Sequence, residues 1–247
     1  MNYVLCVPEQ LRGRLAGFPR LYAFPREPEP SEGELCILDS GAFGLSKAGR
    51  QTHMSADYMR RLDEHYRRFG VAANTVCVAP DVFGDPGQTL RQWRWWHAEG
   101  MPAVVPVVQF PRKRLDLNSV VAQCRAYAPW RPEFVCVSNP SLRAAQAYEQ
   151  LRVALQVLRE LLHPAWVHVL GAGWDVEDIL AWGQLGFESI DSVAYYTAAQ
   201  AGEAWDGAAP DADWCDTAIR NAEVARRLAV PQGSSAKFGA IYSKGEP

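Results

Sequence analysis

The chain has 247 residues, of which 48% are hydrophobic and 21% are charged, and its formal net charge is −3. These values are ordinary for a soluble globular protein with a large core. The slightly acidic balance argues against a surface coated in basic residues for non-specific nucleic-acid binding. No apolar run approaches the roughly 20 residues that cross a bilayer, and the first residues do not resemble a secretory signal. We therefore expect a cytoplasmic protein.

The six cysteines include no Cys-x-x-Cys pair. Four of them lie in apolar runs of strand character, where cysteine acts as a small hydrophobic residue: Cys6, Cys36, Cys77 and Cys136. The sequence offers no cluster of Cys and His at the spacings that bind zinc. We expect reduced thiols, no bound metal and no cofactor.

Short apolar runs of strand character alternate with longer amphipathic segments along the chain. The expected strands are residues 3–7, 21–24, 35–38, 75–78, 103–108, 134–137, 167–170 and 189–193. Most of these runs are continuously apolar, as in parallel strands that are buried on both faces. The expected helices are residues 56–69, 89–99, 141–162, 175–185 and 212–228. Residues 26–33, 197–213 and 231–247 are expected to form loops.

Repeated strand-then-helix units predict a parallel sheet, which is either closed as a barrel or open and doubly wound. Polar residues follow nearly every expected strand. They favour the barrel, because an open sheet concentrates its ligand groups at one switch point. We predict an α/β protein with one (β/α)8 TIM-type barrel domain over residues 1–230 and a C-terminal tail over residues 231–247.

The sharpest motif covers residues 38–44, Leu-Asp-Ser-Gly-Ala-Phe-Gly. An apolar strand here delivers Asp39 and Ser40 into a glycine turn, and the ring of Phe43 follows. Glycine permits tight backbone geometry or the close approach of a ligand. Asp and Ser also cap turns and helices without any further function, and spacing alone leaves these two interpretations even.

Other strand ends carry polar or small residues that could contact a ligand: Asp81, Gln109, Ser138, Asn139, Gly171, Gly173 and Asp191. His168 lies inside an expected strand, and we interpret it as a packed histidine rather than a catalytic base. Three acids and an amide at one barrel mouth suggest glycosidic chemistry. One carboxylate can attack an anomeric carbon or stabilise an oxocarbenium-like transition state, while another moves the proton.

Five short motifs follow one another between about residues 35 and 196: Asp39-Ser40-Gly41-Ala42-Phe43, Pro80-Asp81, Val108-Gln109, Val169-Leu170-Gly171-Ala172-Gly173 and Ile190-Asp191-Ser192. In sequence and order they resemble the motifs of tRNA-guanine transglycosylases. The pattern is closest to the shorter relatives that handle 7-deazaguanine in DNA. The resemblance implies a (β/α)8 barrel that exchanges a guanine for a 7-deazaguanine.

The resemblance also implies a role for each matching residue. Asp191 matches the nucleophile that forms the covalent glycosyl intermediate, and Asp39 matches the acid implicated in proton transfer. Phe43 matches the ring that stacks on the base. Asp81 and Gln109 match the groups that bind the base edge. The expected substrate-binding set is completed by Ser40, Ser138, Asn139, Gly171 and Gly173.

The chain departs from the family pattern at three places. The tRNA-acting members carry a C-terminal zinc site of clustered cysteines and a histidine, of which only Cys215 has a counterpart here. This departure favours DNA over tRNA as the substrate. Ser138-Asn139-Pro140 replaces an expected glycine pair, which leaves the identity of the incoming base open. Tyr195-Tyr196-Thr197 replaces the basic loop that usually follows the nucleophile.

We predict a nucleobase-exchanging glycosyltransferase that acts on nucleic acid and on a free purine or 7-deazapurine base. The nearest alternative is an N-glycosidase that uses water and the same residues. Two further alternatives are a barrel enzyme that acts on a small phosphorylated metabolite and an inactive barrel that binds nucleic acid. Whether the chain also needs a protein partner or forms a homodimer is left open.

Overall fold

The computed structural model describes residues 1–29, 33–47, 55–72, 74–101, 103–110, 116–138, 143–162 and 165–229. Within these ranges the strands are β1 (Asn2–Cys6), β2 (Arg20–Ala23), β3 (Cys36–Asp39), β4 (Thr75–Cys77), β5 (Val107–Gln109), β6 (Phe134–Ser138), β7 (Trp166–Leu170) and β8 (Ser189–Ser192). The α-helices are α1 (Ala42–Lys47), α2 (Ala56–Phe69), α3 (Pro86–Ala98), α4 (Leu117–Tyr127), α5 (Ala144–Leu162), α6 (Val176–Leu185), α7 (Ala194–Gln200) and α8 (Trp214–Ala229).

The strands form one parallel sheet in the order β4-β3-β2-β1-β8-β7-β6-β5. The first strand therefore pairs with the last, and the sheet curls so that β4 and β5 form its two ends. An isolated parallel bridge joins Val78, just after β4, to Val105, just before β5. The N–H of Val105 donates to the Cys77 carbonyl at 2.8 Å, and the N–H of Ala79 donates to the Val105 carbonyl at 2.9 Å.

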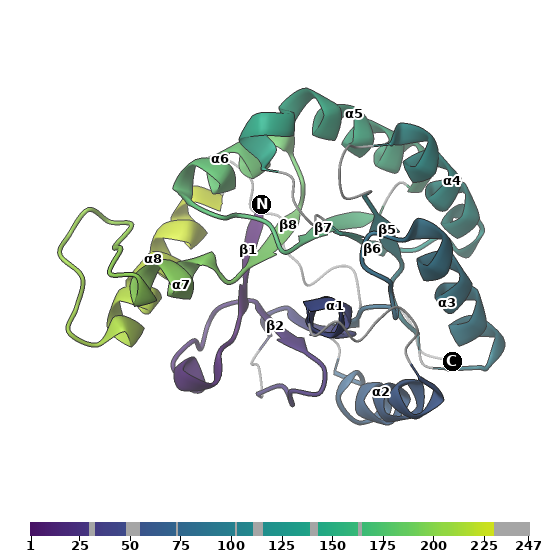
Figure 1. Cartoon of the computed structure of the whole chain (residues 1–247), viewed down its shortest axis with the longest axis horizontal. Coiled ribbons are helices and arrows are strands. Elements are labelled where there is room, and N and C mark those ends of the chain that lie inside the picture. The colour runs from purple at the N-terminus through teal and green to yellow at the C-terminus, as the bar shows by residue number, and fades with distance from the viewer. Residues whose placement is uncertain are drawn as a thin grey trace.

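Figure 1 shows how the helices surround this sheet. Helices α2 to α6 and α8 lie outside the strands, whereas α1 lies near the middle of the view. The connection between α7 and α8 projects away from the rest of the chain. This arrangement leaves one side of each strand facing helices and the other facing the inside of the curl.

Two sets of buried side chains follow from the alternation of side chains along each strand. The outer set packs between the sheet and the helices and includes Leu38, Val108, Val137, Val169 and Ile190. The inner set fills the inside of the curl and includes Val4, Leu21, Ile37, Val76, Val107, Phe134 and Cys136. Residues that are two apart on a strand therefore point to the same face of the sheet.

Local capping sets the ends of several helices. The Ser55 hydroxyl accepts the Tyr58 N–H at the start of α2, and the Asp175 carboxylate accepts the Asp178 N–H at the start of α6. Both are typical N-cap hydrogen bonds that satisfy a free backbone donor. Gly186 ends α6 with φ of 87°, a left-handed conformation that favours glycine.

The predicted α/β class, the eight predicted strands and the five predicted helices are confirmed, with shifts at their ends. The largest strand shift is at β5, which begins at Val107 because Pro106 has no N–H to donate to the ladder. Three helices were not predicted: α1, α4 and α7. Helix α7 corrects the loop expected over residues 197–213, because its Ala-rich sequence continues as helix to Gln200.

The predicted tail, residues 231–247, lies outside the described residues. Among the helices that are described, none combines the length and the apolar character needed to cross a membrane.

Candidate functional site

Polar side chains gather where the strands end. Since all eight strands are parallel, their carboxyl ends meet at one end of the sheet, which we call the mouth. Five strands carry a polar residue at or next to this end: Cys6, Asp39, Gln109, Ser138 and Asp191. Asp39 lies two residues after Ile37, and Gln109 lies two residues after Val107, both of which belong to the inner set. The strand alternation therefore turns these polar side chains toward the inside of the mouth.

Asp81 is buried among side chains from two other strand ends. The Ser40 hydroxyl donates to Asp81 Oδ1 at 2.9 Å, and the Gln109 amide donates to Oδ2 at 2.6 Å. Gln109 is held in turn, because its Oε1 accepts the Gly84 N–H at 3.0 Å and its backbone N–H donates to Gln123 Oε1 at 2.8 Å. Each carboxylate oxygen can accept a second hydrogen bond, so the group can bind N–H donors of a ligand.

The Asp81 carboxyl retains a raised affinity for protons despite these donors. Burial raises its pKa to about 6, while the hydrogen bonds from Ser40 and Gln109 act in the opposite direction. Three of the residues predicted to bind substrate, Ser40, Asp81 and Gln109, are thus in mutual contact. The functional roles that the sequence assigns to them stay predictions.

Asp39 has fewer hydrogen-bond donors. Its Oδ2 accepts the Gly41 backbone N–H at 2.9 Å. Burial, together with the negative charges of Asp81 and Asp191, raises the pKa of Asp39 to about 7. A carboxyl with a pKa near 7 can donate or accept a proton close to neutral pH.

The turn after Asp39 is fixed by close contacts. Gly41 has φ of 77°, and a Cβ at this position would lie 2.7 Å from the Phe24 carbonyl oxygen and 2.9 Å from the Tyr58 hydroxyl. The Tyr58 hydroxyl also donates to the Ser40 carbonyl at 2.8 Å. Only glycine fits this turn, which holds Asp39 and Ser40 in place.

Asp191 is the third acid at the mouth and is 4% exposed. The Gly171 N–H donates to its Oδ1 at 3.1 Å, and the His168 Nε2 lies 3.0 Å from the same oxygen. The Cys6 thiol donates to Oδ2 at 3.1 Å. Burial and the charge of Asp191 raise the pKa of the Cys6 thiol well above its usual range, so the thiol keeps its proton.

His168 is the contact that the sequence did not predict. Its burial within β7 confirms a packed histidine, yet its ring also contacts the third acid of the mouth. The sequence feature that indicates this contact is a two-residue spacing of side chains with N–H or oxygen groups on neighbouring strands: Trp166 and His168 on β7, Ser189 and Asp191 on β8. The register pairs His168 with Ser189, which brings these polar side chains together.

An exposed aromatic ring lies next to the turn of the first acid. Phe43 is in the first turn of α1, is 50% exposed, and meets Phe83 edge to face with 5.3 Å between ring centroids. Gly171 is also exposed, with φ of 68° and no atom within 4 Å of where a Cβ would be. Gly173 is buried, and its N–H donates to Asp178 Oδ2 at 3.1 Å. Phe43 and Gly171 are thus the two predicted substrate residues here that have exposed surface.

Two predicted substrate residues remain. Ser138 is buried at the end of β6, in line with Cys136 of the inner set, and Asn139 lies outside the described residues. No group of three or more His, Cys, Asp or Glu side chains in the described part of the chain could hold a metal ion. All six cysteines are free.

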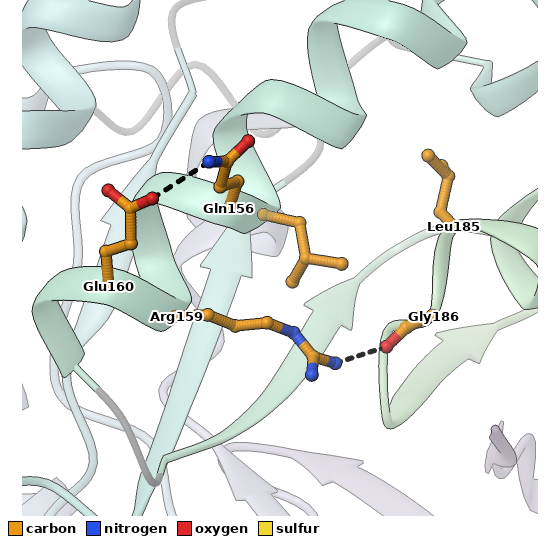
Figure 2. A pocket seen from close by; sticks show the side chains of 6 residues that line it. Gln156, Arg159, Glu160, Leu185 and Gly186 are labelled. Carbon is orange, nitrogen blue, oxygen red and sulfur yellow. Dashed lines mark hydrogen bonds between the residues drawn. The ribbon is translucent and has the colours of Figure 1, made fainter.

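A separate surface pocket lies between α5 and the end of α6 (Figure 2). Arg159 donates to the Gly186 carbonyl at 2.6 Å, and Gln156 donates to Glu160 at 2.9 Å. The pocket borders the residues that lead into β8, which places it at the amino end of that strand. None of the predicted site residues lines it.

No family model and no curated protein matches the chain. Among solved structures, the Amycolatopsis orientalis BexX/CysO complex is similar, with a TM-score of 0.48 and 14% identity over 85% of this chain and 79% of that chain. A likeness at this level says nothing about the site.

Proposed function

We propose that this chain is a nucleobase-exchanging glycosyltransferase that acts on nucleic acid through a covalent intermediate on Asp191. The observation that carries the proposal is the contrast between two acids at one mouth. Asp191 accepts from the Gly171 N–H and the Cys6 thiol and contacts His168 Nε2, whereas the pKa of Asp39 is raised to about 7. Two carboxyl groups in different environments at one site suit the separate roles of nucleophile and acid.

The proposed reaction assigns a separate step to each of the two acids. Asp191 attacks C1′ of the sugar, the C1′–N bond breaks, and its electron pair goes to the departing base, which takes a proton from Asp39. In the second step the incoming base attacks C1′ and gives a proton to Asp39, while the bond between C1′ and Asp191 breaks. Two displacements retain the configuration at C1′.

Base recognition is assigned to the cluster of Asp81, Ser40 and Gln109. A carboxylate with free lone pairs suits the ring and exocyclic N–H groups of a purine edge. The exposed ring of Phe43 suits stacking on the base. The Val78–Val105 bridge supports a sheet that closes as a (β/α)8 barrel around this cluster.

Within this proposal DNA is favoured over tRNA. The motifs resemble the shorter transglycosylase relatives that act on DNA, and the cysteine cluster of the tRNA-acting members has no counterpart in the sequence. The second substrate is then a free purine or 7-deazapurine base.

The test is incorporation of labelled guanine into duplex DNA, single-stranded DNA or tRNA. We expect label in DNA with the wild-type protein and none with Asp191→Asn. Release of unlabelled guanine without incorporation would favour the hydrolytic N-glycosidase instead. If guanine is neither released nor incorporated with any of the three nucleic acids, the proposed function is wrong.

A further inference from the structure

A line of hydrogen bonds runs from Asp191 into the inside of the sheet. His168 Nε2 lies 3.0 Å from Asp191 Oδ1, and His168 Nδ1 lies 2.8 Å from the Ser189 hydroxyl. The Trp166 indole N–H donates to the same hydroxyl at 2.7 Å. His168 and Ser189 are fully buried. The acid at the mouth is thus connected to three polar side chains that no ligand needs to touch.

The hydrogen bonds in this line have a definite direction. An indole N–H can only donate, so the Ser189 oxygen accepts from Trp166. The remaining neighbour of that oxygen in the described part of the chain is His168 Nδ1, which can accept the hydroxyl proton. His168 then carries its own proton on Nε2 and donates it to Asp191. This assignment follows from the complete network of partners rather than from the ring alone.

From this geometry we infer that His168 is a positioning residue for Asp191. It donates its Nε2 proton to Oδ1 and leaves Oδ2 as the attacking oxygen. Among the described residues Oδ2 accepts from the Cys6 thiol alone, which is a weak donor, whereas Oδ1 accepts two N–H groups. The inference rests on the proposed function, because it specifies how the nucleophile of that reaction is held.

The surroundings leave this task to His168. The other titratable groups that interact with the Asp191 charge are Cys6, Tyr3, Cys136 and Asp39. Burial raises the pKa of Cys6, Tyr3 and Cys136, so these groups stay neutral. The inner positions that pair with this line on the neighbouring strands are apolar: Val4 opposite Asp191, Phe134 opposite Trp166 and Cys136 opposite His168. Buried polar groups cost free energy unless they are fully paired, and packing alone would be served by apolar side chains here.

The test compares four variants in single-turnover formation of the covalent adduct with a guanine-containing DNA oligonucleotide. We expect His168→Leu to slow adduct formation about 100-fold and His168→Gln only about 10-fold, because the glutamine amide restores one donor. Ser189→Ala should have a smaller effect, since it removes only the group that fixes the histidine tautomer. Tyr127→Phe is the matched control, as it removes another buried hydrogen bond, to the Val107 carbonyl at 3.0 Å.

Three further measurements separate positioning from folding. The dissociation constant for free guanine and the melting temperature of His168→Gln should stay near those of the wild type. Nitrogen-15 NMR should assign one of the five histidines, identified by its loss in His168→Gln, to the form with the proton on Nε2.

The outcomes distinguish this inference from the proposed function. A wild-type protein that neither exchanges guanine nor forms an adduct would overturn both. A wild-type protein that reacts, together with a His168→Gln or His168→Leu variant that reacts as fast as Tyr127→Phe, would overturn the role of His168 alone. A proton on Nδ1 instead of Nε2 would also overturn it.

Discussion

Asp191 and Asp39 lie at the carboxyl ends of strands in the same curled sheet, but their surroundings differ. Asp191 on β8 faces donors from β1, from β7 and from the turn after β7. Asp39 on β3 accepts a hydrogen bond from its own turn and lies within reach of two negative charges, which together with burial raise its pKa to about 7. The hydrogen-bond partners of an acid at a strand end are therefore set by the neighbouring strands and turns, not by its position at that end.

The largest effect should come from removing the charge of Asp191. Asp191→Asn keeps the shape of the side chain but removes the anionic nucleophile. We expect the rate of guanine exchange to fall by about 10⁴-fold or more, measured by incorporation of labelled guanine. The matched control is Asp57→Asn, because Asp57 is exposed. Asp178→Asn is unsuitable as a control because Asp178 holds the neighbouring turn. Residual exchange within 10-fold of the wild type would remove Asp191 from the reaction.

Asp39 should give the next largest effect, with a pH dependence. Asp39→Asn cannot protonate the departing base, and loss of general acid catalysis costs roughly 10²–10⁴-fold. In the wild type, adduct formation should slow as the pH rises through about 7, because the acid then loses its proton. Stopped reactions from pH 5.5 to 8.5 would measure this profile. A wild-type profile that is flat, or that rises across this range, would contradict the acid role.

Replacement of Asp81 should affect binding rather than chemistry. Asp81→Ala removes one charged hydrogen-bond partner, worth about 1.5–3 kcal/mol, or roughly a 10- to 150-fold loss in affinity for free guanine. Isothermal titration calorimetry measures the affinity. Asp85→Ala is the matched control from the same loop, because Asp85 caps α3 through the Gln88 N–H. Equal guanine affinities of the two variants would reduce Asp81 to a structural residue.

The smallest effect concerns stability. Asp39 holds its proton in the folded chain up to about pH 7, but in the unfolded chain only up to its ordinary pKa of 3.8. The folded protein thus loses stability as the pH rises from about 4 to 7. Relative to the wild type, Asp39→Asn should gain about 1–3 kcal/mol in free energy of unfolding between pH 4 and pH 8. This range lies below the full free energy of the pKa shift because Asp39 is partly exposed. Urea denaturation at both pH values measures this, and no relative gain would contradict the raised pKa.

The sequence predicted the sheet well because each strand is a short apolar run followed by a polar group. It missed α1 and α7 because they have only 6 and 7 residues. It missed α4 because Asn118 and Ser119 at its start also suit a turn, and Val120 and Val121 also suit a strand. It also placed the three acids at strand ends. These features depend on residues that are close together in the chain.

The contacts around each acid could not be predicted. Cys6 and Asp191 are 185 residues apart, and His168 reaches Asp191 only through the register of β7 against β8. The alternation along a strand predicts which face a residue occupies, but not which side chain on the neighbouring strand lies within hydrogen-bonding distance. For this reason His168 was interpreted as packing alone.

Mapping the covalent adduct tests the central claim most directly. The protein would be incubated with a guanine-containing DNA oligonucleotide, denatured and digested, and the modified peptide identified by mass spectrometry. We predict an adduct on Asp191 in the wild type and in Asp39→Asn, and none in Asp191→Asn. An adduct on Asp39, or an undiminished adduct in Asp191→Asn, would contradict the assignment of the two acids.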